Sequence, residues 1–173
     1  MGWRDSQRAL DQHRIDLDYF ALLKGTIEHQ ECAFDMLVGA PRVPDQGLFI
    51  PPRKLRALID TGCTEGAIRL GLALDLGLTQ VDERLVQTAS TGDGYDLCPV
   101  YAAEIEIVCL GATLRVIRNL VAQNMEDDVL LGMDMLVGGI LVVDYVHGLW
   151  DWRYVSPEKL PVGAVPPVPF SPP

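Results

Sequence analysis

One tripeptide, Asp60-Thr61-Gly62, constrains the fold of this chain more than any other stretch. It follows the apolar run Ala57-Leu58-Ile59, which reads as a buried strand, and its glycine permits a tight turn. About seventy residues further on, a second apolar run, Val129-Leu130-Leu131, ends at Gly132. Two buried strands that each end beside a glycine indicate a mostly β fold in which a carboxylate stands at the end of a strand.

The tripeptide can be read in two ways. Alone, an Asp close to a Gly is an ordinary strand-ending turn. Together with Leu130-Leu131-Gly132, it resembles the motif pair of the retropepsins, the retroviral-type aspartic proteases, and especially of their bacterial relatives. The resemblance covers about residues 20–155. It implies a mostly all-β fold, the closed β-barrel that forms one half of an acid protease, with one or two short helices.

The chemistry of this family needs two carboxylates and one water molecule. Two carboxylates held close together cannot both be ionised, so one proton is shared by the pair. The charged member takes a proton from the water and the neutral member polarises the scissile carbonyl, as is known for aspartic proteases as a class.

This chain has one Asp-Thr/Ser-Gly, because Thr91-Gly92 follows Ser90 and not an aspartate. The second carboxylate must therefore come from a second chain or from an unrelated side chain. A residue near a two-fold axis meets its own copy. We therefore expect a homodimer in which Asp60 is paired across that axis, as the resemblance also implies.

The resemblance gives roles to the residues around Asp60. The Thr61 hydroxyl would hydrogen-bond across the dimer axis, and Gly62 would let substrate or water approach the backbone. Leu130-Leu131-Gly132 would support the triad loop. Many viral members carry an arginine after this last glycine, and its salt bridge supports the loop. Here Met133 and Asp134 follow instead, so another group must support the loop or the loop is looser.

Cys63 directly follows the triad, where retropepsins usually carry Ala or Ser. It is read either as a small buried filler or as an oxidisable switch. His29 and Cys32 have the spacing of a metal-binding pair, but no second pair completes a site. We therefore expect no metal, no cofactor and four reduced thiols, which are Cys32, Cys63, Cys98 and Cys109.

A glycine-rich stretch lies between two predicted strands, 85–90 and 95–108, and indicates a β-hairpin. A plain hairpin is one interpretation. Its position between the two motifs favours the other, because in retropepsins the matching hairpin is the flap that closes over the substrate. Its predicted substrate-binding residues are Ser90, Thr91, Gly92, Asp93 and Gly94.

Periodicity and turn residues predict the remaining elements. Trp150, Trp152 and Tyr154 share one strand face and belong to the core or to a dimer interface. His147 is expected to be solvated, without a catalytic role. The predicted elements are strands over 20–28, 32–38 and 53–59, a proline-rich loop over 40–52 that could border the substrate groove, a helix over 65–76 capped by Gly77, one bent strand or a strand pair over 113–122, a short helix from 133 to 136, and a hairpin formed by 140–145 and 149–155.

Composition limits the partners. The net charge of −10 argues against a nucleic-acid partner, since phosphate binding needs cationic surfaces. No apolar stretch approaches 18 residues and no signal peptide is visible. We therefore expect a cytoplasmic location without a membrane partner. We also expect a charged N-terminal extension over 1–18, a retropepsin-like domain over 19–155 and a Pro-rich disordered tail over 156–173.

Three functions follow from these observations. The first is a homodimeric aspartic endopeptidase that acts on a peptide or protein substrate. The second is a catalytically inactive member of the same fold that dimerises or binds peptides, an alternative prompted by Cys63 and by the missing arginine. The third is a structural β-protein in which the triad has no catalytic meaning.

Overall fold

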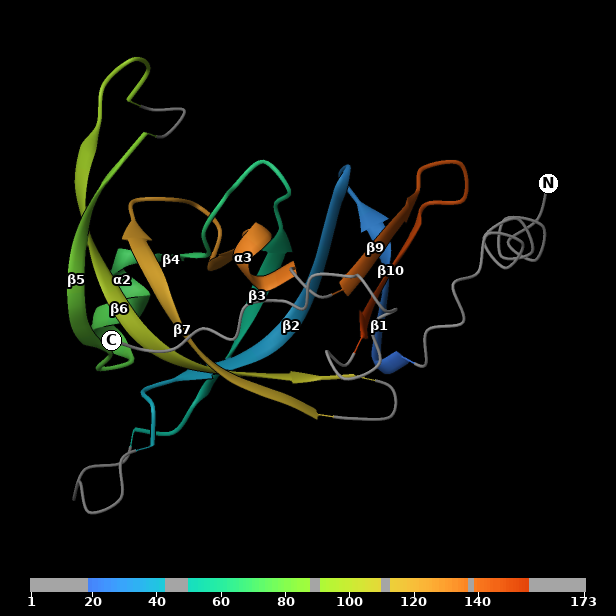
Figure 1. Ribbon diagram of the computed structural model, residues 1–173, viewed down its shortest axis with the longest axis horizontal. Coiled ribbons are helices and arrows are strands. Elements are labelled where there is room, and N and C mark those ends of the chain that lie inside the picture. Colours follow the sequence, from blue (N-terminus) through green and yellow to red (C-terminus); the bar gives the residue numbers. More distant parts are fainter. Residues whose placement is uncertain (1–18, 43–49, 88–90, 110–112, 137–138, 156–173) are drawn as a thin grey trace, which may run out of the picture.

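The computed structural model describes residues 19–42, 50–87, 91–109, 113–136 and 139–155 (Figure 1). The expected N-terminal extension, the expected Pro-rich tail, Ser90 and most of the 40–52 loop lie outside these ranges. Strands dominate the described part, and two short helices accompany them. The expectation of a mostly β fold with one or two short helices is confirmed.

The elements follow one another in this order: β1 (Tyr19–Glu28), β2 (Glu31–Gly39), β3 (Arg53–Ile59), β4 (Ala67–Arg69), α2 (Leu70–Asp75), β5 (Thr79–Val86), β6 (Asp96–Val108), β7 (Thr113–Gln123), β8 (Val129–Leu131), α3 (Met133–Leu136), β9 (Gly139–Asp144) and β10 (Leu149–Val155).

Six of these strands close into a barrel in the order β6-β7-β4-β8-β3-β2, and pairing of β2 with β6 completes the ring. Closure removes the exposed edges of these strands. The barrel interior is apolar. On β6, Ile105 and Ile107 are buried while Glu104 and Glu106 lie on the outer face. The closed retropepsin-like barrel is therefore confirmed.

Strand β8 lies between β3 and β4, parallel to the first and antiparallel to the second. Ile59 is level with Leu131, and Ala67 is level with Leu130. The chain therefore leaves β3, forms the loop that holds Asp60, and returns as β4 on the other side of β8. This topology brings the two motifs of the sequence together at one end of the barrel.

A three-stranded antiparallel sheet, β1-β10-β9, continues from the barrel through a short β1–β2 pairing. Trp150 and Trp152 face the core and are each 2% exposed. A Cβ atom at Gly25 would stand 2.5 Å from the Trp150 ring, so this glycine makes room for the indole. The two tryptophans are therefore core residues; the Tyr154 side chain lies outside the described part.

The helix expected over 65–76 is only partly correct. Residues 67–69 form β4, and the helix α2 is restricted to 70–75. Ala67 and Ile68 pair with β7 on one side and with β8 on the other, so hydrogen bonds from distant strands override the local helical periodicity. Gly77 has φ +61° and ends the helix as expected.

Two further strand expectations are refined. Residues 113–123 form one continuous strand, β7, which pairs with β6 along most of its length. Strand β5 begins at Thr79, six residues before the expected start at 85, because its N-terminal half pairs with β6 across a bulge between Gln80 and Asp82.

Candidate active site

Asp60 stands at the end of β3 and is held there by main-chain hydrogen bonds. Its N–H donates to the Leu131 carbonyl at 3.0 Å, and its own carbonyl accepts from the Cys63 N–H at 3.3 Å. The Gly62 N–H donates to Asp60 Oδ1 at 2.9 Å. The carboxylate is half-buried and is oriented by the backbone of its own turn.

Gly62 also contributes by its lack of a side chain. A Cβ atom at this position would stand 3.2 Å from Asp60 Oδ1. Thr61 and Gly62 are both exposed, so the surface beside the carboxylate is open. The arrangement leaves room for a water molecule or a substrate backbone next to Asp60.

The rest of the triad loop is fastened to the second motif. The Met133 N–H donates to the Cys63 carbonyl at 2.8 Å, and the Asp134 N–H donates to the Thr64 carbonyl at 3.1 Å. A Cβ atom at Gly132 would lie 2.5 Å from the main-chain carbon of Glu65. Gly132 therefore permits a backbone-to-backbone approach that a side chain would prevent.

A cavity of about 320 Å³ opens beside the carboxylate. Asp60 and Thr61 form one part of its lining, and Leu141, Val143 and Tyr145 form another. The last three residues belong to β9 and the turn after it, and sequence reasoning did not connect them with Asp60. No local signal marks them, because only the long-range pairing of β1, β10 and β9 places them there.

The expected flap corresponds to the hairpin between β5 and β6. The Gln87 side-chain amide donates to the Gly92 carbonyl at 2.8 Å, and the Gly94 N–H donates to the Thr91 carbonyl at 2.9 Å. Gly92 adopts φ +59°, and Asp93 is exposed. Ser90 lies outside the described residues. The described part of the hairpin tip and the triad loop project towards the same end of the molecule (Figure 1).

The comparisons with known proteins agree with this geometry. The family model described as gag-polyprotein putative aspartyl protease matches residues 50–137, just over half of the chain, including the triad, the hairpin and Leu130-Leu131-Gly132. This chain belongs to the retropepsin-like aspartic protease family. A search of the curated proteins finds no match.

One solved structure of a retropepsin-like protein has the same fold. The retropepsin-like aspartic protease from Rickettsia conorii is 16% identical with a TM-score of 0.50, and the match covers 77% of this chain and 90% of that one. The EIAV protease, complexed with the inhibitor HBY-793, is 14% identical with a TM-score of 0.39; that match covers 62% of this chain and 86% of the protease.

An arginine from β5 bonds a side chain of the triad loop in this retropepsin-like chain. The Arg84 guanidinium, on β5, bonds the Glu65 carboxylate and also lies 3.5 Å from Asp82 Oδ2. Position 133, where many viral members carry the arginine, holds an exposed methionine.

Asp134 lies under the triad loop. Its Oδ1 atom is buried without a hydrogen-bond partner. Burial raises the pKa of this carboxyl group. A main-chain hydrogen bond from Met135, the positive charge of Arg118 and a main-chain hydrogen bond from Gly66 oppose that rise only in part. Asp134 is thus a carboxyl group that the folded protein holds more easily in its neutral form.

The environment of Cys63 favours its interpretation as a small packing residue over its interpretation as a redox switch. Burial raises the pKa of its thiol, and the negative charges of Asp60, Asp134 and Glu65 raise it further. A reactive cysteine needs the opposite environment, because the thiolate is the reactive species. All four cysteines of the chain are free thiols.

The expectation that His147 is merely solvated is wrong. His147 is partly buried, and its Nδ1 atom lies 2.7 Å from Asp144 Oδ2. Asp144 Oδ1 accepts the N–H groups of Val146 and His147 at 3.0 and 3.1 Å. These bonds lower the pKa of Asp144, the His147 side chain being the largest cause. The turn that carries Tyr145 beside the Asp60 cavity is therefore fixed by its own side chains.

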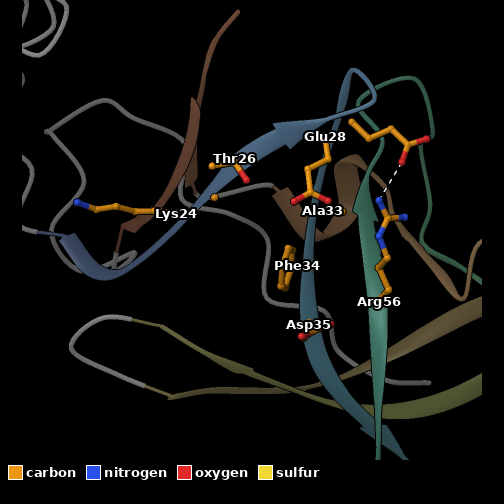
Figure 2. A pocket seen from close by; sticks show the side chains of 9 residues that line it. Lys24, Thr26, Glu28, Ala33, Phe34, Asp35 and Arg56 are labelled. Atoms are coloured by element: carbon orange, nitrogen blue, oxygen red, sulfur yellow. Dashed lines mark hydrogen bonds and ion pairs between the residues drawn. The ribbon is translucent and has the colours of Figure 1, made fainter. Parts of the chain in front are cut away.

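A second cavity, of about 310 Å³, lies on β1, β2 and β3 and contains no member of the triad. Lys24 and Arg56 stand on opposite sides of it, with Phe34 between them (Figure 2). Glu31 lines both this cavity and the Asp60 cavity, and it bonds Arg56 at 2.9 Å. The Glu31 side of this ion pair therefore borders both cavities.

The described residues contain no group of three or more His, Cys, Asp or Glu side chains placed to hold a metal ion. They also contain no helix that is long and apolar enough to cross a membrane.

Proposed function

We propose that this chain is a homodimeric aspartic endopeptidase in which Asp60 and its symmetry copy activate the water that attacks a peptide bond. One observation carries the proposal: a half-buried carboxylate, fixed by the Gly62 N–H at 2.9 Å, lines an open cavity at the junction of the two family motifs. The family membership of the chain supports the same chemistry.

In the proposed reaction, one carboxylate of the pair is charged and the other carries the shared proton. The charged carboxylate takes a proton from water as the oxygen attacks the scissile carbonyl carbon. The neutral carboxyl group donates its proton to the carbonyl oxygen, which gives a neutral tetrahedral diol. As the diol collapses, one carboxyl group protonates the leaving nitrogen, a diol hydroxyl gives its proton to the other carboxylate, and the C–N bond breaks, so the dyad ends with one proton, as it began.

The free edge of β9 supports the proposal of a second copy. Among the described strands, β9 ends the sheet and pairs with β10 alone. Its central residues, Ile140 to Val143, are all apolar and carry none of the charges that usually protect a sheet edge. Leu141 and Val143 share the Asp60 cavity. Antiparallel pairing of β9 with its own copy about a two-fold axis would bring two such cavities together.

The proposed role of the hairpin is to cover a bound peptide. Thr91, Gly92, Asp93 and Gly94, together with Ser90, would contact the peptide backbone, and Thr61 would stabilise the pairing of the two triad loops. Loops that close over a substrate exclude water and complete a catalytic site. The short bonds within the tip, from Gln87 to Gly92 and from Gly94 to Thr91, give the hairpin a defined shape for this purpose.

The test is cleavage of a mixed peptide library from about pH 3 to about pH 8, a range that includes the upper titration step of the pepsin dyad, at about 4.7. Wild type and Asp60→Asn are compared, and both are checked for equal melting temperature and equal mass in solution. Cleavage by the wild type that disappears in the variant is the expected result. Equal cleavage by both proteins would refute the assignment. Peptide binding without turnover, unchanged by the substitution, would favour the inactive binding module.

A further inference from the structure

The triad loop and the β5–β6 hairpin are joined by a pair of opposite charges. Arg84 on β5 bonds the carboxylate of Glu65, five residues after Asp60. Glu65 is 42% exposed in its side chain and Arg84 is 37% exposed. A pair that is open to water to this extent contributes little to the free energy of unfolding. The pair is therefore expected to affect the relative position of the triad loop and the hairpin more than the stability.

The backbone of Glu65 is fixed on every side. It lies against Gly132, with no space for a side chain between them. The carbonyl before it, at Thr64, accepts from Asp134, and the carbonyl after it, at Gly66, accepts from Val121 at 3.0 Å. The Glu65 carboxylate therefore extends from a backbone segment that main-chain hydrogen bonds hold on both sides.

Arg84 occupies the matching place on the hairpin. It is level with Cys98 on β6, and its neighbour two residues on, Val86, packs against a small cluster that includes Cys98 and Val100. One residue further, Gln87 closes the described part of the tip through Gly92. Because β5 is paired with β6 and moves as a unit, a displacement of Arg84 would also change the contacts of Val86 and Gln87.

We propose that Arg84 is a positioning residue, which fixes the β5–β6 hairpin at a defined distance from the catalytic loop through its bond with Glu65. The proposal rests on the protease function proposed above, since the hairpin needs this alignment only if a peptide lies between it and Asp60. The geometry predicts an effect on catalysis that is larger than the effect on stability.

The pair is tested with Arg84→Gln, Glu65→Gln and the charge-swapped double variant Glu65→Arg/Arg84→Glu. The matched control is Arg115→Gln. Arg115 is also a strand arginine that contacts two carboxylates, Glu106 at 2.6 Å and Glu104 at 3.3 Å, and its side chain is 51% exposed. It lies on β7. Among the described residues, it forms no ion pair or hydrogen bond with the triad loop or with β5.

Three quantities are measured for each protein: kcat and KM on a peptide that the wild type cleaves, the melting temperature, and amide hydrogen exchange by NMR. We expect each single variant to lower kcat/KM by about tenfold, the order of loss that a slightly misplaced catalytic element causes. The swapped variant should regain most of this loss. The melting temperature should hardly change, and the control should behave like the wild type.

Hydrogen exchange tests the proposal without any need for activity. The Gly94 amide, which bonds Thr91 within the hairpin, should exchange faster in Arg84→Gln and slow again in the swapped variant. Unchanged exchange of this amide in Arg84→Gln would overturn the proposal. If the wild type cleaves no peptide, the proposed protease function fails while the exchange data still decide whether the pair holds the hairpin.

A role in substrate recognition would give a different pattern of rates. If Glu65 or Arg84 bound a charged group of the peptide, the single variants would lose activity only towards peptides of one charge. The swapped variant would then prefer the opposite charge, and this result would also overturn the proposal. A positioning role predicts equal losses for acidic, basic and neutral peptides.

Discussion

The N–H of Asp60 donates to the carbonyl of Leu131 at 3.0 Å, so the catalytic candidate is bonded directly to the second motif of the sequence. This bond continues the parallel pairing of β3 with β8, in which Ile59 is level with Leu131. Asp60 is therefore held in place by the paired strands of the barrel and not by a free loop. A site built on paired strands is held more firmly than one built on a loop alone.

The first prediction concerns Gly132. In Gly132→Ala the new Cβ atom would meet main-chain atoms of Glu65 at 2.5–2.9 Å, and backbone cannot rotate away as a side chain could. We expect a loss of about 1–3 kcal/mol in the free energy of unfolding, as for other overpacked sites. Denaturant unfolding measures the stability, and peptide cleavage reports the displaced triad loop.

Gly71→Ala is the matched control for that experiment. Gly71 lies within α2, and a Cβ atom there would meet nothing within 4 Å. Alanine is favoured over glycine in a helix by about 1 kcal/mol, so this variant should be as stable as the wild type or more stable. A Gly132→Ala protein that matched Gly71→Ala in stability would show that the loop can move away from β8.

A segment could be predicted from the sequence where its own residues determine its structure. It could not be predicted where its hydrogen bonds come from strands far away in the chain. The strand before Asp60, the strand that ends at Leu131 and the helix after Gly132 could be predicted, because short apolar runs and glycines mark them locally. The alternation of Glu104 and Ile105 likewise reports directly which face of β6 is buried.

Other parts could not be predicted, for a physical reason. Ala67 forms a strand because β7 and β8 bond it from both sides, and those partners lie more than fifty residues away in the chain. Tyr145 joins the Asp60 cavity only through the pairing of β9 with β10 and of β10 with β1. The contact of Arg84 with Glu65 joins side chains 19 residues apart, on β5 and on the triad loop, and no local pattern links them.

The second prediction concerns Asp134 and pH. Its pKa in the folded protein is raised above the ordinary value of 3.8, so the folded state binds the proton more tightly than the unfolded chain does. The contribution of protonated Asp134 to the free energy of unfolding is fully present below pH 3.8, and it is lost as the pH rises through the folded-state pKa of Asp134. Asp134→Asn removes the titration, so the variant should be more stable than the wild type at neutral pH.

Melting temperatures of both proteins across the acidic range measure this effect. The advantage of Asp134→Asn should shrink as the pH falls and should vanish below pH 3.8. A constant difference at every pH would mean that the effect comes from altered packing and not from the charge of Asp134.

The third prediction concerns the turn beside the Asp60 cavity. The pKa of Asp144 is lowered from 3.8 by its bond with His147, so the stability it contributes is present above pH 3.8 and is lost as the pH falls through the lowered value. Asp144→Asn should therefore melt at a lower temperature than the wild type at pH values above 3.8. The two proteins should approach the same melting temperature in stronger acid, where the wild-type carboxyl group is neutral as well.

The fourth prediction concerns Cys63. Because its thiol pKa is raised by burial and by nearby carboxylates, the thiolate is scarce at neutral pH. Iodoacetamide should modify Cys63 more slowly than it modifies a free cysteine, as followed by mass spectrometry of the peptide that contains it. Cys63→Ala should keep the cleavage rate of the wild type. Rapid alkylation that stops cleavage in the wild type but not in Cys63→Ala would instead support the redox switch.

The fifth prediction tests the edge of β9 as the surface that joins two copies. Ile140 is 40% exposed on this strand, and a lysine at an exposed sheet edge opposes pairing with another strand. Ile140→Lys should raise the dimer dissociation constant by about tenfold or more, equal to about 1.4 kcal/mol, as measured by analytical ultracentrifugation. Cleavage should fall with the fraction of dimer, because each chain supplies one Asp-Thr-Gly.

Val108→Lys is the control for that experiment, because Val108 is a more exposed apolar residue, at 67%, and ends β6 in the barrel. It should leave the dissociation constant unchanged. Equal weakening by both lysines would mean that added charge acts through the net charge of the chain. A dimer that persists in Ile140→Lys with full activity would place the two-fold axis at another surface, and Asp60 would then have to meet its copy without the pairing of β9.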